Sequence, residues 1–397
     1  MMEFAPLAKI KSELSAYLGK RERFNESELR FVVSPYRIFP LGECIGLQGG
    51  PVMGMTINAY SVVAYIPSKE PSLRLYSMNY PGVSEFGINN IRTPEKGDWG
   101  RFAMGATKVF DEVYHLKRGI IGAVYGTLPE SGLGSSSSIG LAYLKALADV
   151  NRIEPGYSEY IALSRQLENN YLTLGGGIFD QSVMVYGREN NLILIDLTSG
   201  SIESFPKHES CDSFRILVIN SGVNTETYQK ENIKYIQESR DTALLLGTLG
   251  GLKNVKSISE IPEDIFLDKG SKLPDNLRLI ASRYYAEARR VSAGLETWSR
   301  GDIAALGEKM NESGKSSPYL TRAEINELWE ITRSAKGVYG CNICTKGRGA
   351  SIAAFVNKDF SYQSANEILN QYKKLHPEVE NNASTFFAKT ENRLRML

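Results

Sequence analysis

The sequence predicts a mixed α+β fold that is divided into two domains or into two lobes of one unit. A chain of 397 residues can bury a sizeable core. Apolar residues recur at helical spacing in stretches such as 157–171, whereas 214–221 is the short apolar run typical of a strand. A polar break at 205–213 separates the halves. The domains are therefore predicted to cover residues 1–207 and 208–397.

Charge, hydropathy and cysteine content exclude several classes of function. The chain has 46 Lys and Arg against 45 Asp and Glu, so no basic surplus favours nucleic acid or an anionic membrane as a partner. No apolar run is long enough to span a bilayer, and the first residues lack a signal-peptide core. Four cysteines in a chain of this length favour a reducing compartment. We therefore expect a cytoplasmic protein, either a monomer or a weak homodimer.

The most informative stretch is a Gly/Ser loop between a predicted strand at 119–125 and a predicted helix at 139–150. Gly132 and Gly134 allow its backbone to turn without a Cβ clash. The N–H groups at the helix start and the positive end of the helix dipole suit an anion, and we expect that anion to be a phosphate. A Ser-rich loop that only caps the helix is the alternative interpretation.

This loop is not a Walker A loop, because no Lys follows its last glycine. Its pattern, Pro129-x-x-Gly-Leu-Gly-Ser-Ser136, instead resembles the ATP-phosphate loop of the GHMP kinases, which include galactokinase, homoserine kinase and mevalonate kinase. The resemblance implies that ATP is bound. Trp99 matches a Trp near the adenine in galactokinases, with packing in an interdomain seam as the alternative. The residues implied to bind ATP are Gly132, Leu133, Gly134, Ser135, Ser136, Ser137 and Trp99.

A second block, residues 31–50, resembles the galactokinase signature of an Arg followed by Gly-Glu-His-x-Asp-Tyr-x-Gly-Gly. After a short predicted strand at 31–33, Pro35 and Pro40 are expected to break regularity. The matching residues are Arg37, Gly42, Glu43, Gly49 and Gly50, and the departures are Cys44 for His, Gly46 for Asp and Leu47 for Tyr. The sugar-contacting positions that the resemblance implies are Glu43, Cys44, Gly46, Tyr228 and Asn232. A surface ion pair of Arg37 and Glu43 is the alternative.

Glu168 and Asp180 are the candidate carboxylates, and their spacing of twelve positions (180 minus 168) resembles the family's gap between metal ligand and base. For Asp180, a helix N-cap is the alternative interpretation. The resemblance implies that Glu168, with Ser135 or Ser136, holds Mg²⁺, a cation that prefers oxygen ligands. It also implies that Asp180 accepts or orients the proton of the sugar hydroxyl and that Arg37 offsets charge beside it.

The resemblance covers nearly the whole chain and is strongest from Val33 to Tyr186. It implies the two-lobed GHMP kinase fold, with a ribosomal-protein-S5-like first domain, a ferredoxin-like second domain and the active site between them. The implied activity is an ATP-dependent sugar 1-kinase of the galactokinase type. A galacturonate 1-kinase is the alternative, because Ser34-Pro-Tyr-Arg-Ile38 and Met55-Thr-Ile-Asn58 are more similar to galacturonokinase. A non-catalytic sugar/ATP sensor on the same scaffold is a third possibility, disfavoured by the retained Arg and carboxylates. Because Glu43 would repel a C6 carboxylate, we predict a neutral aldose as the preferred substrate.

Overall fold

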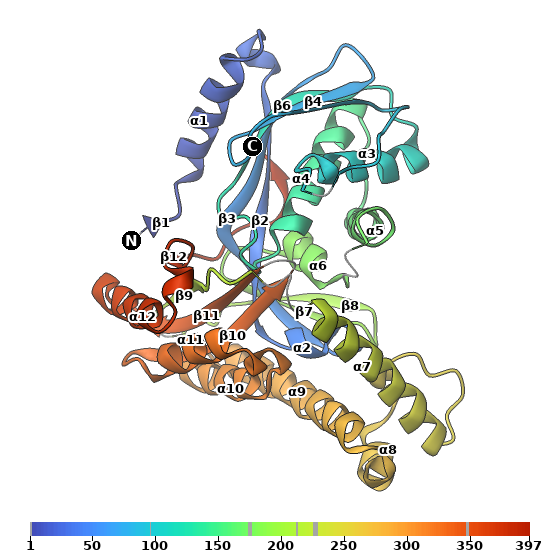
Figure 1. Ribbon diagram of the computed structural model, residues 1–397, viewed down its shortest axis with the longest axis vertical. Helices are drawn as coiled ribbons and strands as arrows, with labels where there is room; N and C mark the ends of the chain where they lie inside the picture. The colour runs from blue at the N-terminus through green and yellow to red at the C-terminus, as the bar shows by residue number, and fades with distance from the viewer. Residues whose placement is uncertain (1, 96, 174–176, 212, 225–228, 347–348) are drawn as a thin grey trace.

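Two β-sheets form the frame of the protein (Figure 1). The computed structural model describes residues 2–95, 97–173, 177–211, 213–224, 229–346 and 349–397. The first sheet has the order β13-β2-β3-β6-β4-β5, and β7 and β8 continue from β3. Its strands are β2 (Arg30–Leu41), β3 (Val52–Pro67), β4 (Ser72–Ser77), β5 (Val83–Gly87), β6 (Ile120–Gly126), β7 (Asn191–Asp196), β8 (Ser201–Pro206) and β13 (Arg395–Met396).

Helices cover both faces of the first sheet, as the alternation of side chains along its strands requires. Val32 and Val63 point into the core shared with the helices of one face, whereas Val33 and Val62 point to the opposite face, which packs against α1 (Leu7–Gly19). The helices of the first face are α3 (Arg101–Tyr114), α4 (Ser135–Asn151), α5 (Tyr157–Gln166) and α6 (Phe179–Tyr186). A π-helical turn, Leu167–Tyr171, follows α5.

The second sheet has the order β1-β12-β9-β11-β10. Its strands are β1 (Met2–Glu3), β9 (Phe214–Asn220), β10 (Val338–Lys346), β11 (Gly349–Asn357) and β12 (Ser384–Ala388). One face packs on α11 (Ala323–Ser334) and α12 (Tyr362–Leu375). The other face shares a core with residues of β2 and β3, and with α9 (Asp275–Ser299) and α10 (Ile303–Ser316). That shared core joins the two sheets.

The α+β class predicted from the sequence is confirmed by this architecture. The domain boundary at residue 207 stays a prediction, and strand pairing crosses it at both termini. β1 pairs with β12 in the second sheet, and β13 pairs with β2 in the first. None of the helices within the described residues is long and apolar enough to cross a membrane.

The expected break at residues 34–41 is wrong, because β2 runs without interruption from Arg30 to Leu41. Its pairing with β3 shifts register between Pro35 and Tyr36 and again between Ile38 and Leu41. A β-bulge tolerates a proline because the missing N–H is not needed in a regular ladder there. The two prolines therefore mark irregular pairing within one long strand that reaches both sheets.

The region of α2 (Glu43–Gly46) connects β2 to the helices at the far end of the molecule (Figure 1). Ile45 of α2 belongs to an apolar cluster with α9 and α7 (Gln229–Leu249), and α8 (Glu263–Lys269) lies beside them. The end of β2 and the start of α2 are thus held by elements from the second half of the chain.

Candidate active site

Arg37 lies at the centre of the site, on β2, where the two sheets meet. Its side chain is buried, with 1% exposed. Nε donates to Oδ1 of Asp180 at 2.6 Å, and Nη1 donates to the carbonyl oxygen of Gly132 at 2.7 Å. Nη2 lies 4.0 Å from Oε1 of Glu43. One guanidinium therefore joins the candidate base, the Gly/Ser loop and the candidate sugar segment.

The environment of Arg37 keeps it charged. Burial alone would lower the pKa of the guanidinium, but the negative charges of Asp180 and Glu43 outweigh it, and the pKa is raised. A buried guanidinium needs such partners, because a charge taken out of water without them is very costly. Arg37 is thus no surface residue, and its carboxylate partners form a buried cluster around one cation.

Asp180 lies in the first turn of α6, two positions after the N-cap residue Ile178. Only 4% of the residue is exposed. Oδ1 accepts from Arg37, and Oδ2 accepts from the hydroxyl of Ser137 at 3.5 Å. The positive end of a helix stabilises a carboxylate in its first turn. Arg37, Ser137 and the helix start therefore orient this carboxylate, which is not the N-cap.

Glu168 lies in the π-helical turn and is fully buried. Its Oε1 accepts from Ser137 at 2.5 Å, and its Oε2 accepts from Nε2 of Gln181 at 3.0 Å. The Ser137 hydroxyl, from α4, thus lies between the two candidate carboxylates, and its single proton is much closer to Glu168 than to Asp180. π-Helical turns are frequent at functional sites, because the extra residue re-aims a side chain.

The serines of the loop divide between two positions. Ser137 contacts Glu168, whereas the hydroxyl of Ser135 accepts from the backbone N–H of Glu130 at 3.3 Å. Ser135 and Ser136 are half-buried in the first turn of α4. Sequence reasoning placed Ser135 or Ser136 beside Glu168 and did not single out Gln181. The Asp-Gln pair at 180–181 was the available signal for that side chain.

The Gly/Ser loop is packed tightly against both sheets. Gly132 and Gly134 have φ values of +81° and +79°. A Cβ at Gly132 would lie 2.6 Å from the carbonyl oxygen of Cys344 and 2.7 Å from that of Gly349. Leu133 is fully buried, and its carbonyl accepts from the N–H of Arg37 at 3.1 Å. Gly134 is the N-cap of the 17-residue helix α4, a position that suits a bound anion.

Glu43 begins α2 and lies close to the second sheet. Its Oε1 accepts from the backbone N–H of Thr345, in β10, at 3.0 Å. Next to it, Cys44 is half-buried. Burial, followed by the charges of Glu287 and Glu43, raises the pKa of the Cys44 thiol well above its usual value. The shift favours the protonated thiol, which is a weaker nucleophile than the thiolate.

Gly46 faces an aromatic ring. A Cβ at this position would lie 2.9 Å from two ring atoms of Phe179 and 3.0 Å from Cγ2 of Val52. The Phe179 ring thus occupies the space beside position 46, where the galactokinase signature has an Asp. Phe179 directly precedes Asp180, so the departure at Gly46 and the candidate base are adjacent in space.

The remaining predicted residues lie around this centre or outside the described part of the chain. Trp99 is half-buried, donates from Nε1 to the carbonyl of Pro81 at 3.1 Å, and packs on the core beside the first sheet. Tyr228 lies outside the described residues. The backbone of Asn232 belongs to α7, and its side chain lies outside what the structure describes.

Comparisons with known proteins identify relatives over most of the chain. The family model "GHMP kinases N terminal domain" matches residues 101–188. Galacturonokinase from Arabidopsis thaliana is 32% identical over 383 residues, which is 90% of this chain and 90% of that protein. Galactokinase from Clostridium acetobutylicum is 25% identical over 352 residues, 85% of this chain and 88% of that protein.

Solved structures share the fold. Galactokinase from Lactococcus lactis, crystallised in complex with galactose, superimposes with a TM-score of 0.88 at 21% identity, over 98% of this chain and 100% of that one. Mevalonate kinase from Methanococcus jannaschii gives a TM-score of 0.66 at 15% identity, over 93% and 100% of the two chains. At these identities the superpositions establish the architecture and leave the substrate open.

Proposed function

The chain belongs to the galactokinase branch of the GHMP kinases and is a sugar kinase, and we propose that it uses ATP and Mg²⁺ to phosphorylate the anomeric hydroxyl of a neutral aldose. One observation carries this proposal. Asp180 is held by Arg37 on one oxygen, and its other oxygen lies 3.5 Å from the hydroxyl of Ser137, beside a helix start that suits phosphate. A base and an anion site at one place are what phosphoryl transfer needs.

In the proposed mechanism, Asp180 accepts or orients the proton of the anomeric hydroxyl as that oxygen attacks the γ-phosphoryl group, while the bond from the γ-phosphorus to the bridging oxygen breaks and ADP leaves. Arg37 keeps Asp180 oriented and offsets negative charge that gathers on the phosphoryl group. The loop glycines let the backbone approach the ATP phosphates closely, and the first turn of α4 presents N–H groups to them. Because Arg37 also binds the carbonyl of Gly132, it ties the base to the loop.

The oxygen-rich corner around Glu168 fits a magnesium ion. Mg²⁺ is a hard cation that prefers oxygen ligands and is usually held by one or two protein groups together with substrate phosphates. When bound with ATP, it supplies neutralisation of the phosphate charge. Glu168 would hold it together with a loop serine, for which the resemblance implies Ser135 or Ser136, whereas the serine beside Glu168 in the structure is Ser137. The contact from Gln181 would orient the Glu168 carboxylate.

The choice of a neutral aldose rests on charge. Asp180 and Glu43 already face Arg37, so a C6 carboxylate would bring a third negative group to one buried cation. Two carboxylates at 4 Å repel by about 1 kcal/mol even in water-like surroundings. Galacturonate is the second candidate, because the galacturonokinase from A. thaliana is 32% identical over 90% of both chains.

An assay of the purified chain across hexoses, uronic acids and pentoses tests these proposals. We expect sugar-dependent ADP release, with the product identified as a 1-phosphate by phosphorus NMR. Galactose should give a higher kcat/KM than galacturonate, and the methyl glycoside of the best sugar, whose anomeric oxygen is blocked, should give no turnover. ADP release that no sugar stimulates, together with sugar and ATP binding by calorimetry, would instead identify a sensor.

A cytoplasmic location and a monomeric or weakly dimeric state complete the proposal. Cys44, Cys341 and Cys344 are free thiols, and Cys341 and Cys344 are fully buried, which supports a reducing compartment. Sedimentation of the purified chain at several concentrations tests the oligomeric state.

A further inference from the structure

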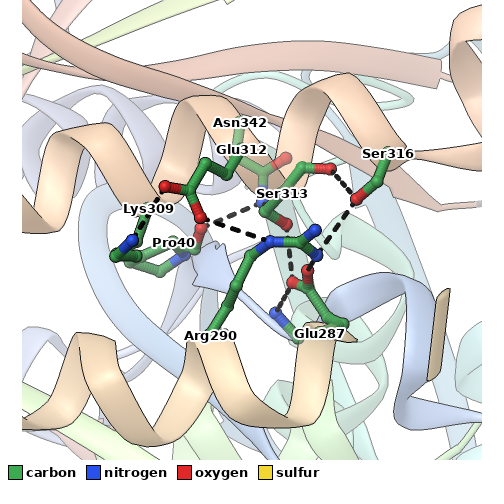
Figure 2. Close-up of polar contacts among 9 residues, drawn as sticks. Pro40, Glu287, Arg290, Lys309, Glu312, Ser313, Ser316 and Asn342 are labelled. Carbon is green, nitrogen blue, oxygen red and sulfur yellow. Dashed lines mark hydrogen bonds and ion pairs between the residues drawn. The ribbon is translucent and has the colours of Figure 1, made fainter. Parts of the chain in front are cut away.

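A buried polar network joins α9, α10 and β10 to the turn that leads into α2 (Figure 2). We call it the Glu287 network and define it by Glu287, Arg290, Ser313 and Asn342. Glu287 is a carboxylate of which only 1% is exposed. Burying a carboxylate costs free energy unless both of its oxygens have hydrogen-bond or ion-pair partners. The partners of Glu287 therefore indicate its role.

Glu287 binds the backbone of the turn directly. Its Oε1 accepts from the N–H of Gly42 at 2.8 Å and from the hydroxyl of Ser313 at 2.6 Å. Its Oε2 accepts from Nη1 of Arg290 at 2.7 Å. The carboxylate is thus charge-balanced on one oxygen and holds Gly42 with the other.

A second side chain of the network binds the backbone two residues earlier, near the end of β2. Nδ2 of Asn342 donates to the carbonyl of Pro40 at 2.9 Å and to the hydroxyl of Ser313 at 3.2 Å. Ser313 therefore connects the two groups that hold Pro40 and Gly42. Figure 2 shows these contacts converging on Ser313 from helix and strand.

Gly42 has little freedom between these anchors. Its φ is +88°, and a Cβ there would lie 2.3 Å from the carbonyl oxygen of Pro51. The next residue is Glu43, whose carboxylate meets the N–H of Thr345 and lies 4.0 Å from Arg37. A small shift of Gly42 therefore moves Glu43 relative to both.

We propose that Glu287 is a positioning residue for the sugar site: by fixing the N–H of Gly42 it sets where the Glu43 carboxylate stands. This inference rests on the proposed function, because it assigns Glu43 to the sugar. Glu287 has no contact with Gly132 or Asp180 among the described interactions, and Arg37 binds both of these directly. Loss of the Gly42 contact should therefore weaken sugar binding and leave ATP binding nearly unchanged.

Two variants distinguish the length of the Glu287 side chain from its negative charge. Glu287→Asp keeps the charge opposite Arg290 but is one methylene too short to hold Gly42. Glu287→Gln keeps the reach and an acceptor for Gly42 but removes the nearer of the two carboxylates that pair with Arg290, the other being Glu312. We expect Glu287→Asp to raise the KM for sugar about tenfold, with the KM for ATP within about twofold, as for one lost hydrogen bond to a charged group. Glu287→Gln should raise the sugar KM only about two- to threefold, although it loses more in melting temperature.

Glu312→Gln is the matched control. Glu312 pairs with Arg290 and Lys309 at the half-exposed outer end and touches no residue of 40–43 in the described contacts. It should leave both KM values unchanged. If the sugar KM follows the melting temperature across the variants, or if the sugar and ATP KM values rise together, Glu287 has only a stabilising role and the proposal is overturned.

Two further measurements keep the test decisive. If Glu287→Asp does not fold, Ser313→Ala removes one hydrogen bond to the same Glu287 oxygen and the link to Asn342, and should raise the sugar KM about threefold. If the unmodified chain binds sugar without turnover, the proposed function fails, and sugar dissociation constants from calorimetry replace KM. Unchanged sugar affinity in Glu287→Asp would then overturn the inference independently.

Discussion

The nucleotide side and the sugar side of this site are built on different constraints. On the nucleotide side, a Cβ at Gly132 would meet the backbone carbonyls of Cys344 and Gly349, and backbone cannot be exchanged by mutation. On the sugar side, a Cβ at Gly46 would meet the ring of Phe179, which is itself replaceable. The first arrangement permits only glycine, whereas the second can change when two side chains change together. The difference explains how one side can keep the family's pattern while the other departs from it.

Arg37 is where the two sides meet, because it binds the loop through Gly132, the candidate base Asp180 and, at longer range, Glu43. Variants on either side of Arg37 should therefore have separable effects. Those on the loop should act on ATP, those on α2 should act on the sugar, and those at Asp180 should act on the chemical step.

The largest effect is expected for Asp180→Asn. The amide keeps an oxygen for Nε of Arg37 but cannot accept a proton, so kcat should fall by about 10²–10⁴-fold while the affinities for ATP and sugar change little. Steady-state kinetics and calorimetry measure the two quantities. Asp241→Asn, an exposed carboxylate on α7, is the control. Turnover within a few-fold of the unmodified chain would remove Asp180 from the mechanism.

Gly134→Val should weaken nucleotide binding more than sugar binding. Gly134 has a φ of +79°, and its Cβ would lie 2.7 Å from Cε of Met184 and 3.2 Å from Nε of Arg37. Backbone strain of about 1–3 kcal/mol for a non-glycine residue at such a φ predicts a loss of ATP-analogue affinity of about tenfold or more. Calorimetric titration with the analogue measures it, and sugar affinity should change less.

Gly140→Ala, on the same helix, is the matched control for Gly134→Val, because its Cβ would have ordinary contacts at 3.4 Å and beyond. It should bind the analogue as the unmodified chain does. A folded Gly134→Val variant with unchanged ATP affinity would show that the phosphates do not approach this loop.

Sequence reasoning identified the parts of the site that local patterns encode. A strand, a Gly/Ser loop and a helix follow one another at 120–151, and the two carboxylates lie within one stretch of chain, so periodicity and spacing reveal them. The roles of these residues stay predictions until the variants are measured. The contact of Glu287 with Gly42 spans 245 positions and follows no local pattern. The same holds for the ring of Phe179 against Gly46, which only packing reveals.

The sequence also could not predict which serine of the loop contacts Glu168. The sequence alone does not distinguish the four consecutive serines. Because α4 turns about 100° per residue, each hydroxyl faces a different neighbour in the structure. Ser137 faces Glu168 and Ser138 binds the carbonyl of Ser34, whereas Ser135 lies at the Glu130 turn. Likewise, the prolines of β2 indicated a break that the bulged pairing with β3 avoids.

Glu43→Ala has the smallest expected effect and bears most directly on the sugar side. Removing this carboxylate leaves Asp180 as the negative partner of Arg37 and frees space near the N–H of Thr345. A relief of about 1 kcal/mol of repulsion corresponds to a shift of about fivefold in the ratio of kcat/KM for galacturonate over galactose. Competition assays with both sugars measure this ratio directly, without depending on the active fraction of enzyme.

Glu43→Gln separates charge from volume, because it removes the negative charge but keeps the side chain. If the ratio rises in both variants, repulsion by Glu43 sets the preference. If it rises only in Glu43→Ala, space is the cause. If galacturonate is already the better substrate of the unmodified chain, then Arg37 offsets the charge of Glu43, and the argument for a neutral aldose is wrong.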